Sequence, residues 1–286
     1  SKTYAGGTTI EKGTLSISAL DALGTGDITI NGGKLLVNAN GTFEYTILGG
    51  ENDGGVLEFG KGAASAATNY NKGLTGNLAL IYSGTSDLNI KTAALITGNN
   101  YTYTGGTWIN SGRLVWGSGS QSTTGAPTYR LGTGAISVAN NATFYIHFGG
   151  TKGSYTDRVQ IPNDINLASG STLHLQDGMI DLTSALHVDG SAKMTMNWSR
   201  QHVWLRNLIG SSQANLSLYG SNAENTNPDF YIMDSGTNGY AGTITVNGPS
   251  GGAAAVAHRT ELVLLTDKSL NSATVNLQGN ANGPAV

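Results

Sequence analysis

The chain has 286 residues, of which 42 are glycine and none is cysteine; 12% are charged, and the formal net charge is −3. Glycine is about twice as frequent as the usual share of roughly 7%, and charged residues are about half as frequent as the usual 25%. This composition excludes a collagen-like period, a membrane-spanning apolar helix, a basic nucleic-acid footprint, and any disulfide or thiolate metal site.

Short segments in which apolar and polar residues alternate follow one another along the chain, and several of them are followed by asparagine or glycine. The clearest are residues 8–10, 14–17, 27–30, 34–37, 135–138, 172–175, 186–188 and 243–246. Alternation with a period of two is typical of strands with one buried face, and glycine and asparagine readily form the turns between them. The sequence therefore predicts an all-β chain.

Two blocks of this pattern occur twice. Residues 4–15 return at 103–114 as Tyr-x-Gly-Gly-Thr-x-Ile-x-x-Gly-x-Leu, and residues 23–30 return at 131–138 as Leu-Gly-Thr-Gly-x-Ile followed by a further apolar position. A weaker third version occupies residues 240–246. Internal repetition of short strands favours a solenoid over a sandwich or a propeller.

These blocks resemble the passenger-associated repeat of bacterial autotransporters. The resemblance implies a right-handed parallel β-helix that is exported to the bacterial cell surface or beyond by a membrane β-barrel following residue 286. We expect one elongated domain over residues 1–286, with loops protruding near 60–73 and 220–239. Such a solenoid is stabilised by the stacking of each coil on its neighbours.

Residues for catalysis are not grouped in the sequence. A polysaccharide lyase or hydrolase built on a β-helix needs clustered carboxylates, whereas here Asp177 and Asp181 are predicted to lie in polar turns that flank a short strand. The segment 233–236 lacks the first glycine of the Gly-Asp-Ser-Gly motif of serine-protease passengers, and the five histidines lack metal spacing. We therefore predict no catalytic residue, no metal and no cofactor.

One segment concentrates aromatic and cationic side chains. A continuous strand with a period of two would place five of them on one face, in register with Met194 and Met196: Trp198, Arg200, His202, Trp204 and Arg206. Indole faces stack on sugar rings, and guanidinium groups bind carboxylate or sulfate, so this face is the predicted ligand-binding site. The alternative is a bend that splits the run and leaves Trp204 and Leu205 buried under a loop.

The predicted function is non-enzymatic adhesion by an exported passenger. Its expected partners are host-surface glycans or proteins, or sibling copies of the chain, and not nucleic acid. Two alternatives remain open at this point. One is a β-helical polysaccharide lyase or hydrolase, and the other is a passive stalk that presents another domain.

Overall fold

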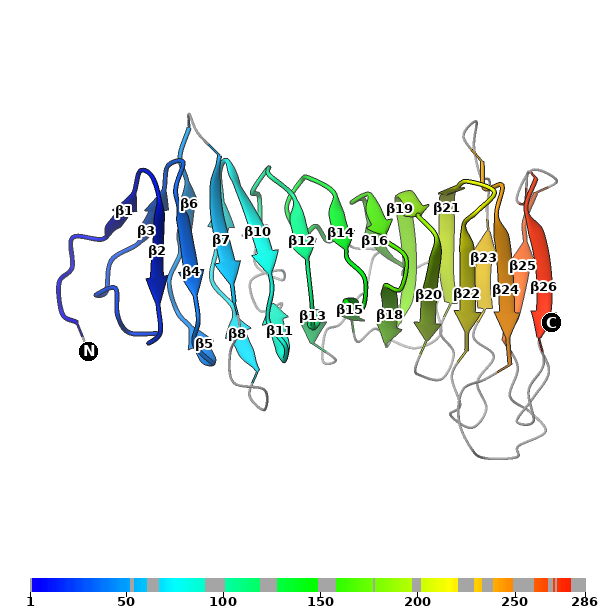
Figure 1. The fold of residues 1–286 in the computed structure, drawn as a ribbon, viewed down its shortest axis with the longest axis horizontal. Helices are drawn as coiled ribbons and strands as arrows, with labels where there is room; N and C mark the ends of the chain where they lie inside the picture. The colour runs from blue at the N-terminus through cyan, green and yellow to red at the C-terminus, as the bar shows by residue number, and fades with distance from the viewer. Residues whose placement is uncertain are drawn as a thin grey trace. The chain divides into compact units, whose positions relative to one another are not determined.

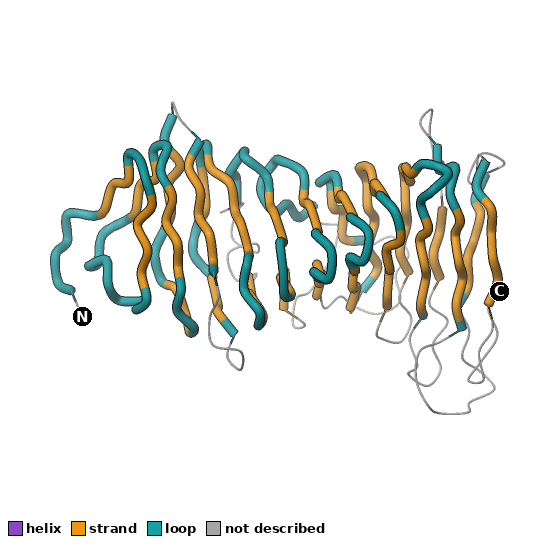
Figure 2. Tube along the Cα trace, in the orientation of Figure 1, coloured by secondary structure: helices purple, strands orange, loops and turns teal. Residues whose placement is uncertain are grey.

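The structure is a computed structural model that describes residues 2–51, 54–60, 67–90, 101–118, 128–148, 158–176, 178–196, 202–220, 229–232, 239–248, 260–266, 270 and 272–278. The described residues form short β-strands joined by turns (Figure 2). Among them we find no helix long and apolar enough to cross a membrane. The chain divides into two compact units, made of Ser1–Gly117 with Arg130–Ser137 and of Ser118–Tyr129 with Val138–Val286.

In the first unit, strands from successive coils lie side by side and run parallel (Figure 1). We call its three stacks of paired strands 1A, 1B and 1C. Stack 1A contains β1 (Thr8–Ile10), β3 (Ile28–Ile30), β6 (Ile47–Gly49) and β9 (Leu74–Thr75). Stack 1B contains β2 (Thr14–Ile17), β4 (Lys34–Val37), β7 (Gly55–Phe59), β10 (Leu78–Tyr82) and β12 (Thr107–Ile109). Stack 1C contains β5 (Gly41–Phe43), β8 (Thr68–Tyr70), β11 (Asp87–Ile90) and β13 (Arg113–Ser118).

The core of the first unit is rich in aromatic rings. Phe43 pairs with Tyr70 on the next coil of stack 1C, and Phe59 of stack 1B packs against both rings at centroid distances of 5.7 Å. All three side chains are at most 1% exposed. Rings at such separations attract one another beyond the burial of their area. Contacts between these aromatic side chains therefore stabilise the stacking of neighbouring coils.

The second unit contains two stacks, which we call 2B and 2C. Stack 2B contains β16 (Val159–Ile161), β17 (Ile165–Leu167), β19 (Met179–Val188), β21 (His202–Gly210), β23 (Asp229–Ile232) and β25 (Glu261–Leu264). Stack 2C contains β15 (Thr143–Phe148), β18 (Thr172–Gln176), β20 (Ser191–Met196), β22 (Asn215–Tyr219), β24 (Thr243–Asn247) and β26 (Thr274–Gln278). The remaining strand, β14 (Ile136–Val138), spans the boundary between the two units in the sequence.

The core of the second unit is mainly aliphatic. In stack 2C, Leu173 pairs with Met194, Met194 with Leu218, and Leu218 with Val246, and all four are fully buried. In-register pairing of parallel strands keeps like positions one above another, so a buried position on one coil selects an apolar residue on the next. Parallel strands stacked coil on coil in both units confirm the predicted parallel β-helix.

The predicted strands agree closely with the observed ones. Segments 8–10, 14–17 and 34–37 match β1, β2 and β4, and the others coincide with or lie within strands to within a residue. The two predicted loops each contain a strand, β8 in the first and β23 in the second, and residues 61–66, 221–228 and 233–238 lie outside the described part. A single domain over the whole chain stays a prediction, because each unit is described by itself.

Candidate binding surface

Strand β21 carries three of the five predicted binding residues. His202 and Trp204 alternate with Val203 and Leu205, which are 0% and 1% exposed in the core. Because neighbouring side chains of a strand point to opposite sides, His202 and Trp204 lie on the outer face of stack 2B. Arg206 follows on the same strand, with its side chain 38% exposed.

The segment is not one continuous strand, which agrees with the alternative that the run is split. Strand β20 ends at Met196 in stack 2C, and β21 begins at His202 in stack 2B. Met194 and Met196 are 0% and 3% exposed and belong to the core, so they do not share the outer face of His202, Trp204 and Arg206. Trp198 and Arg200 fall between the two strands and lie outside the described residues.

The indole ring of Trp204 is enclosed by its neighbours. The ring of Tyr231 on β23 stacks on it at a centroid distance of 5.0 Å and an interplanar angle of 8°. The guanidinium carbon of Arg158 lies 4.2 Å from the centroid of the same indole, within the range of a cation–π contact. Trp204 is only 4% exposed, so its ring offers little free surface for stacking on a sugar.

A buried carboxylate holds the cations in place. Asp181 pairs with Trp204 in the register of β19 and β21, and its side chain is 3% exposed. Arg206 donates from Nε to Oδ1 at 2.8 Å and from Nη2 to Oδ2 at 2.6 Å, and Nη1 of Arg158 lies 3.6 Å from Oδ2. These hydrogen bonds raise the pKa of the Arg206 guanidinium above its usual value. The prediction that Asp181 lies in a turn is wrong, because it sits inside a strand.

Two guanidinium groups thus share one carboxylate on the outer face. We call Arg158, Asp181, Trp204, Arg206 and Tyr231 the outer cation cluster. The arginine side chains are 30% and 38% exposed, whereas the carboxylate is buried beneath them. The solvent side of the cluster therefore presents the partly exposed edges of two guanidinium groups, whose cationic N–H groups can donate to carboxylate or sulfate.

Sequence reasoning missed three members of this cluster. Asp181 was assigned to a turn, and Arg158 and Tyr231 lie on other coils, far from Trp204 along the chain. Their common feature is register: Asp181, Trp204 and Tyr231 occupy equivalent positions on three successive strands of stack 2B. If every coil had the same number of residues, these positions would recur at a fixed spacing in the sequence. The number of residues per coil varies along the chain, so no such spacing is visible.

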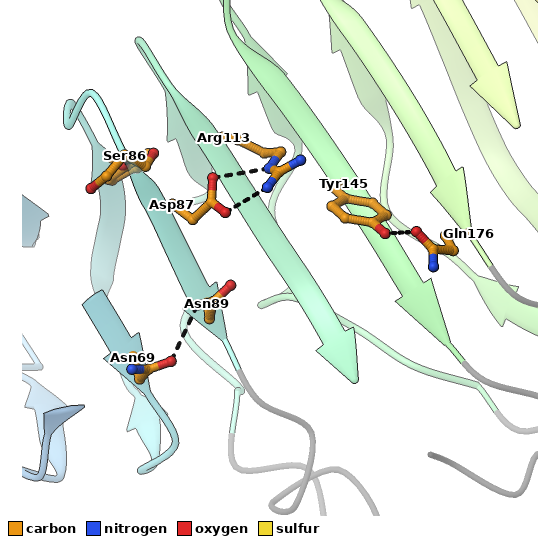
Figure 3. A network of polar contacts seen from close by, with 8 residues as sticks. Asn69, Ser86, Asp87, Asn89, Arg113, Tyr145 and Gln176 are labelled. Carbon is orange, nitrogen blue, oxygen red and sulfur yellow. Dashed lines mark hydrogen bonds and ion pairs between the residues drawn. The ribbon is translucent and has the colours of Figure 1, made fainter. Parts of the chain in front are cut away.

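Elsewhere the outer faces carry polar pairs between coils, some of which Figure 3 shows. Asn89 donates to Asn69 at 3.2 Å, and Arg113 donates two hydrogen bonds to Asp87 at 2.9 and 2.6 Å. Among the described residues, no group of three or more histidine and carboxylate side chains is placed to hold a metal ion.

The two sequence blocks form one structural device, which we call the two-coil clasp. In the first copy, Thr25 N donates to Tyr4 O and Thr8 N donates to Asp27 O, both at 3.0 Å. In the second copy, Thr133 N donates to Tyr103 O and Thr107 N to Ala135 O, both at 2.9 Å. The first block therefore pairs with the second block one coil later.

Glycines make this pairing possible. A Cβ on Gly26 would lie 2.6 Å from Gly7 Cα, and a Cβ on Gly134 would lie 2.7 Å from Gly106 Cα. Gly7 and Gly106 adopt φ values of +75° and +88°, in the region that side chains disfavour. The repeated glycines are therefore required where two coils approach most closely.

The third, weaker version of the pattern lies in the second unit and hydrogen-bonds to the preceding coil. Ala241 N donates to Gly210 O at 2.9 Å, and Thr243 N donates to Ala214 O at 2.8 Å. A Cβ on Gly242 would lie 2.8 Å from the carbonyl carbon of Ala214. The glycine at this position again allows a close approach to the preceding coil.

Comparison with known proteins agrees with the repeated blocks. The passenger-associated-transport-repeat family matches residues 1–17 and 92–115, which contain the first block of both copies. No curated protein and no solved structure matches the chain. The chain thus carries repeats of the passenger-associated-transport-repeat family, the repeat family of autotransporter passengers.

Proposed function

We propose that this chain is the β-helical part of an exported passenger that attaches the bacterial cell to acidic groups on host glycans or proteins, without catalysing a reaction. The outer cation cluster carries this proposal. Its two arginines are partly exposed, while Asp181, the carboxylate that both of them contact, is buried under them. The repeat family supports export to the cell surface or the extracellular space.

The cluster is rigid enough to select a ligand. Arg206 is held by two hydrogen bonds to Asp181, and Arg158 lies against the ring of Trp204, so both guanidinium groups are oriented before a ligand arrives. Orientation in advance lowers the entropy lost on binding. A charge-assisted hydrogen bond contributes about 1.5–3 kcal/mol, so one cluster gives weak binding that many copies on a cell strengthen through avidity.

The test compares the purified chain with an Arg158→Gln variant on a glycan array that contains sulfated, uronate-bearing, sialylated and neutral glycans. We expect the wild type to bind acidic glycans and the variant to bind them several-fold more weakly. Arg158 is the better target, because removing Arg206 would leave the buried Asp181 without its bidentate partner.

Arg113→Gln is the matched control, since it removes the same charge from another outward arginine that is paired with a carboxylate, Asp87. Its binding should equal that of the wild type. Equal loss in both variants would mean that net charge alone matters, and unchanged binding in Arg158→Gln would exclude the cluster.

The enzymatic alternative has its own test. Pectin, alginate, glycosaminoglycans and casein, incubated with the chain with and without calcium, should yield no products. Reproducible cleavage that is abolished in Asp181→Asn would replace adhesion with catalysis, and retention of a folded β-rich spectrum would show that the variant is not simply unfolded.

A passive stalk is the second candidate, and the burial of the aromatic side chains at the start of β21 favours it. His202 and Trp204 are 7% and 4% exposed, so their rings act mainly as packing between coils. If no glycan or protein binds the isolated chain at micromolar concentrations, the stalk becomes the better description.

A further inference from the structure

The first unit has an exposed tryptophan that is separate from the outer cation cluster. Trp108 is the central residue of β12, between Thr107 and Ile109, which are both fully buried. The alternation of the strand places Trp108 on the outer face of stack 1B, where it is 39% exposed.

The indole of Trp108 lies along the strand rather than standing away from it. A Cβ built on Gly106 would lie 3.2 Å from Cη2 and 3.4 Å from Cζ3, the far edge of the ring. The ring edge therefore rests above the Cα of Gly106, and the absence of a side chain there makes room for it. Within the described part of the chain, the indole N–H has no hydrogen-bond partner.

Polar and small apolar side chains flank this ring on neighbouring strands. The outward row of stack 1B runs from Trp108 to Ile81 on β10, then to Glu58 on β7. Glu58 is ion-paired with Lys34, with Nζ 2.8 Å from Oε2. Two residues further along these two strands, Asn110 donates from Nδ2 to Ser83 Oγ at 3.3 Å.

We propose that this face, centred on Trp108, is a binding site for a neutral glycan built of hexose units. The apolar C–H face of one sugar ring stacks on the open face of the indole. Strands lie about 4.8 Å apart, so a second sugar unit over Ile81 reaches Glu58, whose carboxylate accepts hydrogen bonds from sugar hydroxyl groups. Asn110 and Ser83 supply amide and hydroxyl groups at the other side of the ring.

Charge decides in favour of a neutral ligand. Glu58 and Lys34 neutralise each other, and Asn110 and Ser83 carry no charge, so nothing along this row compensates a sulfate or a uronate. A protein partner needs a wider apolar core than one aromatic ring with Ile81 beside it. The row runs across successive strands and is lined by hydrogen-bonding groups, which fits an extended oligosaccharide.

The chain itself supplies the matched variant. The residue equivalent to Trp108 in the first copy of the repeat is Thr9, which also occupies an outward strand position, so Trp108→Thr places at this site a residue that the same motif already accepts. Trp108→Leu is the second variant, because it keeps an apolar side chain but removes the aromatic face.

The experiment is a titration of the ¹⁵N-labelled chain with cellohexaose and maltohexaose, followed by NMR of the tryptophan indole N–H signals. Trp108 is assigned by the signal that disappears in Trp108→Thr. We expect its signal to shift with at least one of the two probes. Binding by the two variants, which lack this indole, is measured by isothermal titration calorimetry beside the wild type. Both variants should bind at least about tenfold more weakly, as expected for the loss of an aromatic stacking contact and its buried area.

Three outcomes would overturn the proposal: no shift of the Trp108 signal with either probe, equal binding by Trp108→Thr, or tighter binding of a heparin hexasaccharide than of the neutral probes at this signal. Self-association that disappears in Trp108→Thr, measured by sedimentation, would assign the face to a second copy instead. The result is independent of the outer cation cluster, so Arg158→Gln should leave the neutral-glycan titration unchanged.

Discussion

The two copies of the repeated motif form the same clasp in different stacks of the β-helix. In the first copy, β1 belongs to stack 1A and β2 to stack 1B, whereas in the second copy β12 belongs to 1B and β13 to 1C. The hydrogen bonds between the two blocks are nevertheless equivalent. The motif therefore specifies how one coil joins the next, and not which side of the coil it occupies.

The surroundings of the two copies differ. Tyr4 is 46% exposed, while the equivalent Tyr103 is fully buried. A Cβ on Gly6 would meet nothing within 4 Å, while one on Gly105 would lie 2.6 Å from Leu78 O, because β10 runs directly beside the second copy. The same residue type thus has different energetic importance in each copy, and four measurements test this difference.

We expect Gly105→Ala to lower the free energy of unfolding the most. The added methyl group would overlap with the backbone at Leu78 and Ala79, and overpacking of this kind costs about 1–3 kcal/mol. Gly6→Ala is the matched control and should change the free energy of unfolding by less than about 0.5 kcal/mol. Urea unfolding measures both variants, and equal effects would show that the two copies are equally enclosed in solution.

The next largest effect is that of Tyr103→Phe. Tyr103 shares a hydrogen bond with the hydroxyl group of Thr107, and both residues are fully buried, so the variant leaves a buried hydroxyl without its partner. We expect the free energy of unfolding to fall by about 1–2 kcal/mol. Tyr4→Phe removes only an exposed contact with Thr8 at 3.2 Å and should be nearly neutral by thermal unfolding.

Alkaline pH should weaken the first unit through its tyrosines. Burial raises the pKa of Tyr70, Tyr101 and Tyr103 above the usual value of about 10. A group whose pKa is raised in the folded state contributes its full stability below the pKa of the unfolded chain. That contribution falls as the pH rises from about 10 towards the raised value.

The measurement is the thermal midpoint between pH 9 and 12. Above about pH 10, Tyr103→Phe should lose stability less steeply than the wild type, by about 1.4 kcal/mol per pH unit for the one proton removed. Tyr4→Phe should follow the wild type, and a variant at position 103 with an unchanged slope would show that this hydroxyl is accessible in the folded chain.

The smallest expected effect is that of Arg113→Thr, which gives the second copy the residue that the first copy has at Thr14. Arg113 forms a bidentate pair with Asp87, but its side chain is 47% exposed, and such pairs contribute about 0–1 kcal/mol. The difference from the wild type should shrink as salt is raised in urea unfolding. A loss above 2 kcal/mol would mean that the pair is shielded from solvent.

Local pattern was sufficient to predict most of the strands. Segments such as 28–30 and 243–246 alternate strictly and are followed by asparagine and glycine, so their strand state depends on nearby residues. The strand at 68–70 was missed because Thr68-Asn69-Tyr70 follows a stretch without alternation. It becomes a strand by pairing with Gly41–Phe43 of the preceding coil and Leu88–Ile90 of the next.

The candidate site was less predictable. The pattern of alternating aromatic and basic residues placed His202, Trp204 and Arg206 together correctly, because they lie on one strand. It also extended that strand back to Met194, although Met194 belongs to β20 of stack 2C and His202 to β21 of stack 2B. Periodicity within a segment gives no signal for such a corner when no glycine or proline marks it.

By itself, the sequence determined the all-β state, because alternation and turn residues are local requirements, and the parallel coil was implied by the resemblance of its two repeated blocks to a known repeat. Only the tertiary structure decided which outward side chains meet across coils. Asp181 lies opposite Trp204, Tyr231 stacks on the same ring, and Trp108 stays open to solvent. These neighbours depend on the number of residues in each coil, and the chain varies that number through turns whose length no strand pattern encodes.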